Sequence, residues 1–104
     1  MKVVYNSLIP WSGFYAINLF GFLFVRDKSK KPVSKITLNH EEIHTAQIKE
    51  LWYLGFYLIY LFEWIIRLFL PGNAYRNISL EKEAFKNQGN LDYLKKRKKF
   101  GMWR

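Results

Sequence analysis

The sequence predicts a small α+β domain, in which three to four helices pack with a small N-terminal β element. Three observations support this class: a stretch rich in aromatic and β-branched residues at 14–25, helix signals from about Thr37, and a long apolar run at 51–70. With 104 residues the chain is long enough for one modest core and too short for two. We therefore treat residues 1–104 as a single domain, with a basic C-terminal tail at about 95–104.

The N-terminal β element is expected at residues 14–25, FYAINLFGFLFV. Aromatic and β-branched side chains dominate this run, and good helix formers are few, so it favours a strand. Gly21 interrupts the run and indicates a bulge or a tight bend. Residues 1–12 are expected to be irregular, and the basic segment 26–35 is expected to be a loop.

The next element, LNHEEIHTAQ, contains the only two histidines of the chain. A helix is expected from about Thr37, with Thr37 or Asn39 as its N-cap. His40 and His44 stand four residues apart, so they project from one helix face, where two imidazoles can hold one metal ion. Glu41 lies roughly 100° around the axis, where it could take a proton from a metal-bound water. The alternative is an ordinary, solvated polar face.

A third ligand would have to be a carboxylate, because the chain has no cysteine and no third histidine. Glu50 lies too far along the same helix. Glu63 has Arg67 four residues later, which favours a helical ion pair. The segment at 77–88, NISLEKEAFKNQ, predicts a short helix. Both acids of that helix, Glu81 and Glu83, are candidates.

HEEIH followed by EKEAF resembles the gluzincin zinc metallopeptidases, especially the compact minigluzincins, over residues 36–88. In that family a downstream helix, often E-x-x-A-D, supplies the third zinc ligand, and aligning Ala84 with the family alanine implies Glu81. The H-x-x-Q pattern that ends at Gln47 also resembles small bacterial domains of this group. The family aspartate, which orients a histidine ligand, is Phe85 here, so that hydrogen bond must come from elsewhere or be missing. This departure favours an alternative: a degenerate HExxH zinc-binding or membrane-surface binding module without catalysis.

The resemblance implies a zinc-dependent hydrolase of the peptidase type, with Zn²⁺ as cofactor and Glu41 as general base. Glu83 remains the alternative metal ligand. The resemblance also implies that residues 14–25 form an edge strand, along which a peptide or protein substrate binds. A donor opposite the metal is needed to stabilise the transition state. Tyr75 and Arg76, in the loop before the Glu81 helix, are the candidates nearest in sequence.

The apolar run at 51–70 has the length of a transmembrane helix, but Glu63 and Arg67 would be costly in lipid. One straight helix from His40 would place Leu70 roughly 45 Å from the metal. The eleven steps from Leu70 to Glu81 reach at most about 40 Å. We therefore expect a break and a second helix that folds back onto the first helix and the strand.

That break is expected near Tyr53 to Phe56, where Gly55 is the weakest helix former. The second helix is expected to keep a surplus apolar face that rests on a membrane or a partner. A short basic helix is expected near the C-terminus.

The charge of the chain indicates an anionic partner. The net charge is +9, and basic residues gather at 26–35 and 95–99. The high aromatic content favours an anionic membrane surface over nucleic acid, with residues 51–70 and 95–104 as the contacts. RDKSKK follows the first apolar run where a cleavage site would be expected, so the N-terminus is not a convincing cleavable signal peptide. We expect the protein to be cytoplasmic, or peripheral on the cytoplasmic membrane face.

Overall fold

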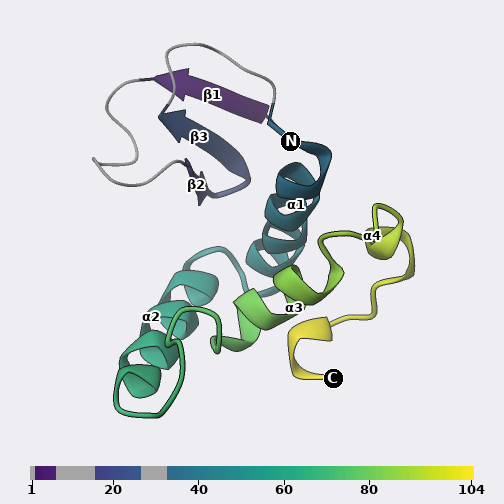
Figure 1. Ribbon diagram of the computed structural model, residues 1–104. Coiled ribbons are helices and arrows are strands. Elements are labelled where there is room, and N and C mark those ends of the chain that lie inside the picture. The colour runs from purple at the N-terminus through teal and green to yellow at the C-terminus, as the bar shows by residue number, and fades with distance from the viewer. Residues whose placement is uncertain (1, 7–15, 27–32) are drawn as a thin grey trace.

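The computed structural model describes residues 2–6, 16–26 and 33–104 and has an α+β fold (Figure 1). Within this part of the chain a three-stranded sheet precedes four α-helices and a short 3₁₀ helix, which confirms the predicted class. The strands are β1 (Lys2–Asn6), β2 (Ala16–Leu19) and β3 (Phe22–Arg26). The helices are α1 (Lys35–Glu50), α2 (Leu54–Leu68), α3 (Ser79–Asn87), α4 (Tyr93–Lys96) and the 3₁₀ helix η1 (Gly101–Trp103).

The sheet has the order β1-β3-β2, with β3 parallel to β1 and antiparallel to β2. The prediction of one strand at 14–25 is wrong, because β2 and β3 form an antiparallel hairpin there. The bend expected at Gly21 is confirmed: Phe20 and Gly21 have φ values of 53° and 94°, as the two central residues of a type I′ turn require. Residues 2–6, expected to be irregular, form a strand because they pair with β3. Most of the predicted basic loop, 27–32, lies outside the described residues.

Helix α1 begins earlier than the sequence indicated. Ser34 is the N-cap, and its hydroxyl accepts a hydrogen bond from the Thr37 amide at 3.1 Å. Neither Thr37 nor Asn39 caps the helix. Asn39 is buried instead, and its side-chain nitrogen lies 2.8 to 3.3 Å from three backbone carbonyl oxygens at the C-terminal end of α3 and just beyond it. Those oxygens belong to Asn87, Gln88 and Asn90, so Asn39 ties α1 to the end of α3.

The expected break between two helices is present, but Gly55 does not cause it. Helix α1 ends in a Schellman motif, in which the Tyr53 amide donates to the Ile48 carbonyl and the Trp52 amide to the Lys49 carbonyl. Trp52 and Tyr53 both have φ values of 61°. Gly55 lies in the first turn of α2, where an added Cβ would meet only the Leu51 Cβ at 3.7 Å. The axis of α2 then turns by 110° from that of α1.

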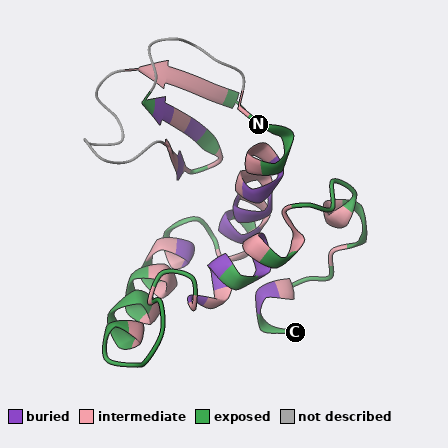
Figure 2. Cartoon of the chain, viewed as in Figure 1, coloured by how far each residue is buried: buried purple, intermediate pink, exposed green. Residues whose placement is uncertain are grey.

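Two groups of apolar side chains form the core. Leu23, Val25 and Ile43 are fully buried in the sheet and α1. The second group joins the end of α1 to α2, α3 and the C-terminus: Ile48, Phe56, Ile78, Leu80 and Met102. Phe56 is the only buried residue of α2, and most of that helix is exposed (Figure 2). The predicted break is therefore present, and α2 packs along one side, through Phe56 against the core and through Glu63 against the start of α3.

Glu63 does not form the expected ion pair with Arg67. Its carboxylate instead accepts hydrogen bonds from the Ser79 amide at 3.0 Å and the Ser79 hydroxyl at 2.6 Å. Ser79 is the first residue of α3, where a negative charge is favourable because of unpaired amides and the helix dipole. Helix α2 thus fixes the start of the helix that carries Glu81.

The C-terminal segment packs onto the body rather than extending into solvent. Arg97 forms ion pairs with Glu50 of α1 at 2.9 Å and with Glu83 of α3 at 2.6 Å. Met102 enters the core, and the Trp103 indole donates to the Ser79 hydroxyl at 3.0 Å. The short helix α4 confirms the predicted basic C-terminal helix.

Candidate metal centre

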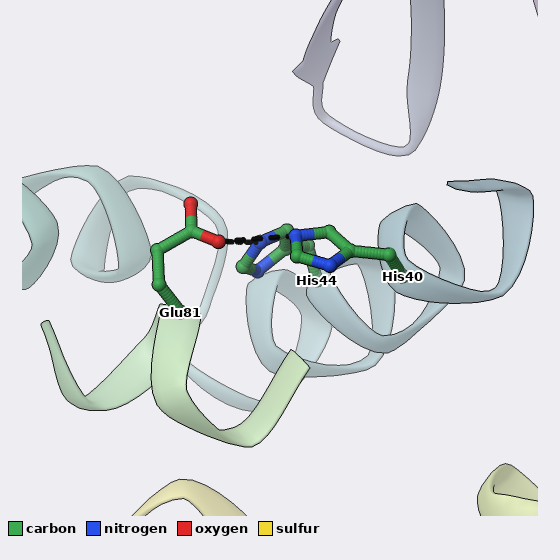
Figure 3. Close-up of side chains that lie close together, drawn as sticks. All are labelled: His40, His44 and Glu81. Atoms are coloured by element: carbon green, nitrogen blue, oxygen red, sulfur yellow. Dashed lines mark hydrogen bonds and ion pairs between the residues drawn. The ribbon is translucent and has the colours of Figure 1, made fainter. Parts of the chain in front are cut away.

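His40, His44 and Glu81 lie together in the interior (Figure 3). Oε1 of Glu81 is 3.0 Å from Nε2 of His40 and 2.9 Å from Nε2 of His44. The two imidazoles come from successive turns of α1, and the carboxylate comes from the first turn of α3. Residues 41 positions apart in the sequence therefore converge on one point.

These three groups fit a metal ion. Two imidazole nitrogens and one carboxylate oxygen are a donor set that zinc and several other divalent metals accept. Metal bonds of about 2.0 to 2.2 Å in a tetrahedral site require neighbouring ligand atoms to be roughly 3.3 Å apart. The two Nε2–Oε1 distances of 3.0 and 2.9 Å are only a few tenths shorter than this requirement. Small side-chain rotations would therefore suffice, although the donor set alone does not select zinc.

Gln47 fixes the tautomer of His44. Its side-chain nitrogen donates to the Leu80 carbonyl at 3.0 Å and to Oε1 of Glu83 at 2.8 Å, which leaves its oxygen facing His44. That oxygen lies 2.8 Å from Nδ1 of His44 and can only accept, so Nδ1 must carry the proton. In a neutral imidazole Nε2 is then bare, which is the form that binds a metal.

Gln88 plays the corresponding part for His40. Its side-chain oxygen lies 2.8 Å from Nδ1 of His40. Phe85 places its ring edge to face against His40, with 4.6 Å between the ring centroids. Phe85 cannot accept a hydrogen bond from His40, and Gln88, three residues later, is the acceptor.

The second oxygen of Glu81 is held by Tyr60 of α2, whose hydroxyl donates to Oε2 at 2.7 Å. Burial raises the pKa of Tyr60 far above its ordinary value, and the negative charge of Glu81 raises it further. The phenol therefore stays protonated and continues to donate. Because Oε1 faces the histidines, this contact fixes which carboxylate oxygen is available to a metal.

Without a metal, a proton occupies the centre. Burial alone would lower the pKa of His44, but hydrogen bonding and attraction to Glu81 outweigh it and raise the pKa to about 9. Burial likewise tends to raise the pKa of Glu81, but hydrogen bonds from His40 and His44 hold it well below the ordinary range. A metal ion would have to displace the proton shared between His44 and Glu81.

Glu41 lies beside this cluster on α1. Burial raises the pKa of its carboxyl above the ordinary value of 4.5, against the opposing influence of the two histidines. Asn18 of β2 donates to the Glu41 carbonyl at 2.9 Å and lies 3.1 Å from the Thr45 hydroxyl. These contacts join strand β2 to the part of α1 that carries His40 and His44.

The structure separates the two candidate transition-state donors. Burial raises the pKa of Tyr75 well above its ordinary value, and the negative charges of Glu81 and Glu41 raise it further, so its phenol lies near the cluster. Arg76 instead lies with its guanidinium carbon 4.2 Å from the centre of the Phe85 ring. Tyr75 is therefore the better placed of the two.

The alternative ligand Glu83 points away from the histidines. Its carboxylate accepts hydrogen bonds from Gln47 at 2.8 Å, from Tyr93 at 2.6 Å and from Arg97 at 2.6 Å. Burial tends to raise the pKa of Glu83, but the bonds from Arg97 and Gln47 lower it overall. Glu83 thus supports Gln47, which in turn orients His44.

Sequence reasoning missed Tyr60, Gln88 and Asn18. Gln47 had a local signal, because it stands three residues after His44 on the same helix. The other three contact the centre from different elements, and nothing in their immediate sequence marks them as neighbours of α1.

Comparison with known proteins gives no match, whether against protein families, curated proteins or solved structures.

Proposed function

We propose that this protein is a zinc-dependent hydrolase that acts on peptide bonds. The observation that carries the proposal is the convergence of His40, His44 and Glu81. The Nδ1 atom of each histidine faces a glutamine oxygen, so that both Nε2 atoms point at one carboxylate oxygen. Such outer contacts orient and tune metal ligands, and an incidental polar helix face does not need them.

The chemistry follows from the residues around the cluster. A bound zinc ion would supply Lewis acidity and lower the pKa of a bound water. Glu41 is the base that accepts the proton of that water, and its raised pKa favours passing the proton on to the leaving amine. Tyr75, whose phenol remains protonated because its pKa is raised, is the donor assigned to a developing oxyanion. Tyr60 and the two glutamines hold the ligands still during the reaction.

Strand β2 supports a peptide as the substrate. It lies at one edge of the sheet among the described strands, and Asn18 connects it to α1 beside Glu41. An extended peptide could add to this edge with its main chain paired to β2.

A second candidate function is metal binding without catalysis. Phe85 favours it, because its apolar ring replaces the family aspartate and packs directly on His40. In this case the metal would join α1 to α3 and stabilise the fold. The two functions predict the same metal content and differ in what Glu41 does.

Metal analysis tests what both functions share. Purified protein supplemented with zinc should retain about one zinc ion per chain through gel filtration, and His44→Ala should lose it. Glu81→Ala should lower zinc content more than Glu83→Ala, because Glu83 faces Arg97 instead. Wild-type protein without zinc after supplementation would contradict both functions.

The variant Glu41→Gln distinguishes the hydrolase from the metal-binding protein without catalysis. This variant should keep its zinc and its fold and lose peptide hydrolysis by about 10²- to 10⁴-fold. Glu42→Gln, on the next residue, is the matched control and should keep activity. Equal hydrolysis by wild type and Glu41→Gln would remove Glu41 from the mechanism, and no hydrolysis by zinc-loaded wild type would favour the binding function.

A further inference from the structure

Helix α2 has its charged side chains on the inside and its apolar side chains on the outside. Glu63 and Arg67 are partly buried on the side that faces the protein, where Glu63 binds the start of α3. The opposite side of the helix is apolar and exposed, as are the residues that flank the helix (Figure 2). We call these residues the α2 apolar face: Leu54, Leu58, Leu61, Phe62, Trp64, Ile65, Ile66, Leu68 and Phe69.

The extent of this face is unusual for a protein surface in water. Phe62 is 65% exposed, Leu58 is 60% exposed and Phe69 is 84% exposed. By the helical repeat, the face covers more than half of the circumference of α2 and carries no charge. Contiguous exposed apolar surfaces of this kind mark contacts with a membrane or another protein.

The length of α2 argues for contact with the surface of a bilayer. No single helix in the described residues is both long enough and apolar enough to cross a membrane, and the α1–α2 pair has those properties only in combination, across its 110° bend. The 15 residues of α2 extend about 22 Å, whereas the hydrocarbon core is roughly 30 Å thick. An interfacial helix needs one polar side, and the rest of the protein supplies it here.

The exposed charges of α3 and the C-terminal segment complement an anionic surface, because most of them are basic. Glu81 and Glu83 are buried and Glu50 pairs with Arg97, so Asp92, beside Lys95, is the exposed carboxylate of this part of the chain. Basic side chains of α3 and the C-terminal segment are exposed: Lys82, Lys86, Lys95, Lys96, Lys98, Lys99 and Arg104. Lysines near anionic lipid each contribute about 1 kcal/mol of attraction.

The C-terminal segment brings aromatic side chains near α2. Ser79 bonds both Glu63 of α2 and the indole of Trp103, so Trp103 lies at the side of α2 that carries Glu63. Phe100 stacks on Trp103 with 5.8 Å between the ring centroids, and both are exposed. Trp52 and Trp64 are exposed at α2 itself. Tryptophan beside basic residues is typical of the interface between lipid headgroups and water.

We infer that the α2 apolar face docks the protein on the surface of an anionic lipid bilayer, with exposed lysines and arginine of the C-terminal segment on the headgroups. The inward charges of α2, its exposed apolar circumference and the exposed basic residues of the C-terminal segment all fit this one occupant. The inference goes beyond the proposed hydrolase, and it stands whether or not the centre is catalytic. Docking in this way would hold the His40–His44–Glu81 cluster close to the membrane. Because the cytoplasmic leaflet carries the anionic lipids, we infer docking on that leaflet.

Vesicle binding of the full chain tests this inference. Wild type should sediment with vesicles of phosphatidylcholine and phosphatidylglycerol, and added salt should weaken the binding. Leu58→Ser/Phe62→Ser should lower the partition coefficient by at least about tenfold, because it removes two exposed apolar anchors. Ile36→Ser/Leu91→Ser is the matched control, since these residues are 50% and 53% exposed elsewhere. It should change binding by less than about twofold.

The lipid charge is tested separately. Lys98→Gln/Lys99→Gln should weaken binding to the anionic vesicles by about tenfold or more and leave binding to pure phosphatidylcholine unchanged. Circular dichroism and metal content should match wild type in every variant. Equal binding by Leu58→Ser/Phe62→Ser and wild type would overturn the inference. The absence of vesicle binding by wild type would also overturn the inference. If wild type then forms dimers in analytical ultracentrifugation, and Leu58→Ser/Phe62→Ser abolishes them, the α2 apolar face is an interface between copies of this chain.

Discussion

At the scale of single residues, two glutamine side chains face the Nδ1 atoms of the two histidines. Gln88 reaches His40, and Gln47 reaches His44, each at 2.8 Å. Gln88→Leu should lower zinc affinity by about 10- to 100-fold, because His40 loses the acceptor that fixes its tautomer. Gln88→Glu keeps an acceptor and should retain wild-type affinity or exceed it. Competition with a chromogenic chelator measures these affinities, and equal affinity of Gln88→Leu and wild type would contradict the role.

The proton held by His44 predicts how metal binding depends on pH. The pKa of His44 is raised to about 9, so the metal-free centre is protonated at neutral pH and a metal must release that proton. Affinity should therefore fall as the pH is lowered, by about tenfold per pH unit below pH 9. Calorimetry in buffers of different ionisation enthalpy should show about one proton released per metal at pH 7. No proton release would contradict this description.

The sequence could reveal only part of this centre, for a physical reason. His40, Glu41 and His44 belong to one helix, so the helical repeat alone relates their positions. Glu81 required a resemblance, because its contact with His40 spans 41 residues. The Gln88 and Tyr60 contacts depend on how α1, α2 and α3 pack, and no local pattern encodes that packing. The lack of a hydrogen-bonding group at Phe85 was visible in the sequence, but the acceptor that Gln88 provides for His40 was visible only in the folded chain.

At the scale of elements, the turn between α1 and α2 shows how tertiary packing overrides helix propensity. Gly55 is the weakest helix former in this region, yet the chain reverses at Trp52 and Tyr53. Packing of Phe56 and Tyr57 against α1 and the hairpin fixes where α2 must begin. Trp52 then occupies the left-handed C′ position that glycine usually takes.

This turn predicts opposite effects of glycine at two neighbouring positions. Trp52 is 87% exposed, so its substitution costs little packing. Trp52→Gly should be more stable than Trp52→Ala by about 1 kcal/mol, because only alanine is strained at positive φ. At Gly55 the order reverses, and Gly55→Ala should stabilise by about 0.5 to 1 kcal/mol. Urea unfolding measures both, and a more stable Trp52→Ala than Trp52→Gly would argue against the left-handed turn.

At the scale of the whole molecule, hydrogen bonds and ion pairs connect the metal centre to the C-terminal segment. His44 contacts Gln47, Gln47 contacts Glu83, and Glu83 contacts Arg97. Arg97 also pairs with Glu50, where α1 ends. The sequence predicted a basic C-terminal tail because five basic residues stand together at 95–99. Only the middle one, Arg97, is internal, and a run of charges gives no sign of which member will be buried.

Arg97 is therefore expected to control both stability and acid sensitivity. Arg97→Ala should destabilise the protein by about 3 to 5 kcal/mol, because Glu83 would remain buried without its cation. Lys96→Ala, on the exposed neighbour, should change stability by less than about 0.5 kcal/mol. The folded-state pKa of Glu83 is lowered from 4.5, so its stabilising contribution is present above pH 4.5 and is lost as the pH falls toward the folded value. Arg97→Ala removes much of that lowering, so urea unfolding from pH 7 to pH 3 should show a shallower loss of stability in the variant than in wild type. If Arg97→Ala and Lys96→Ala have the same small effect, Arg97 does not join the C-terminal segment to the centre.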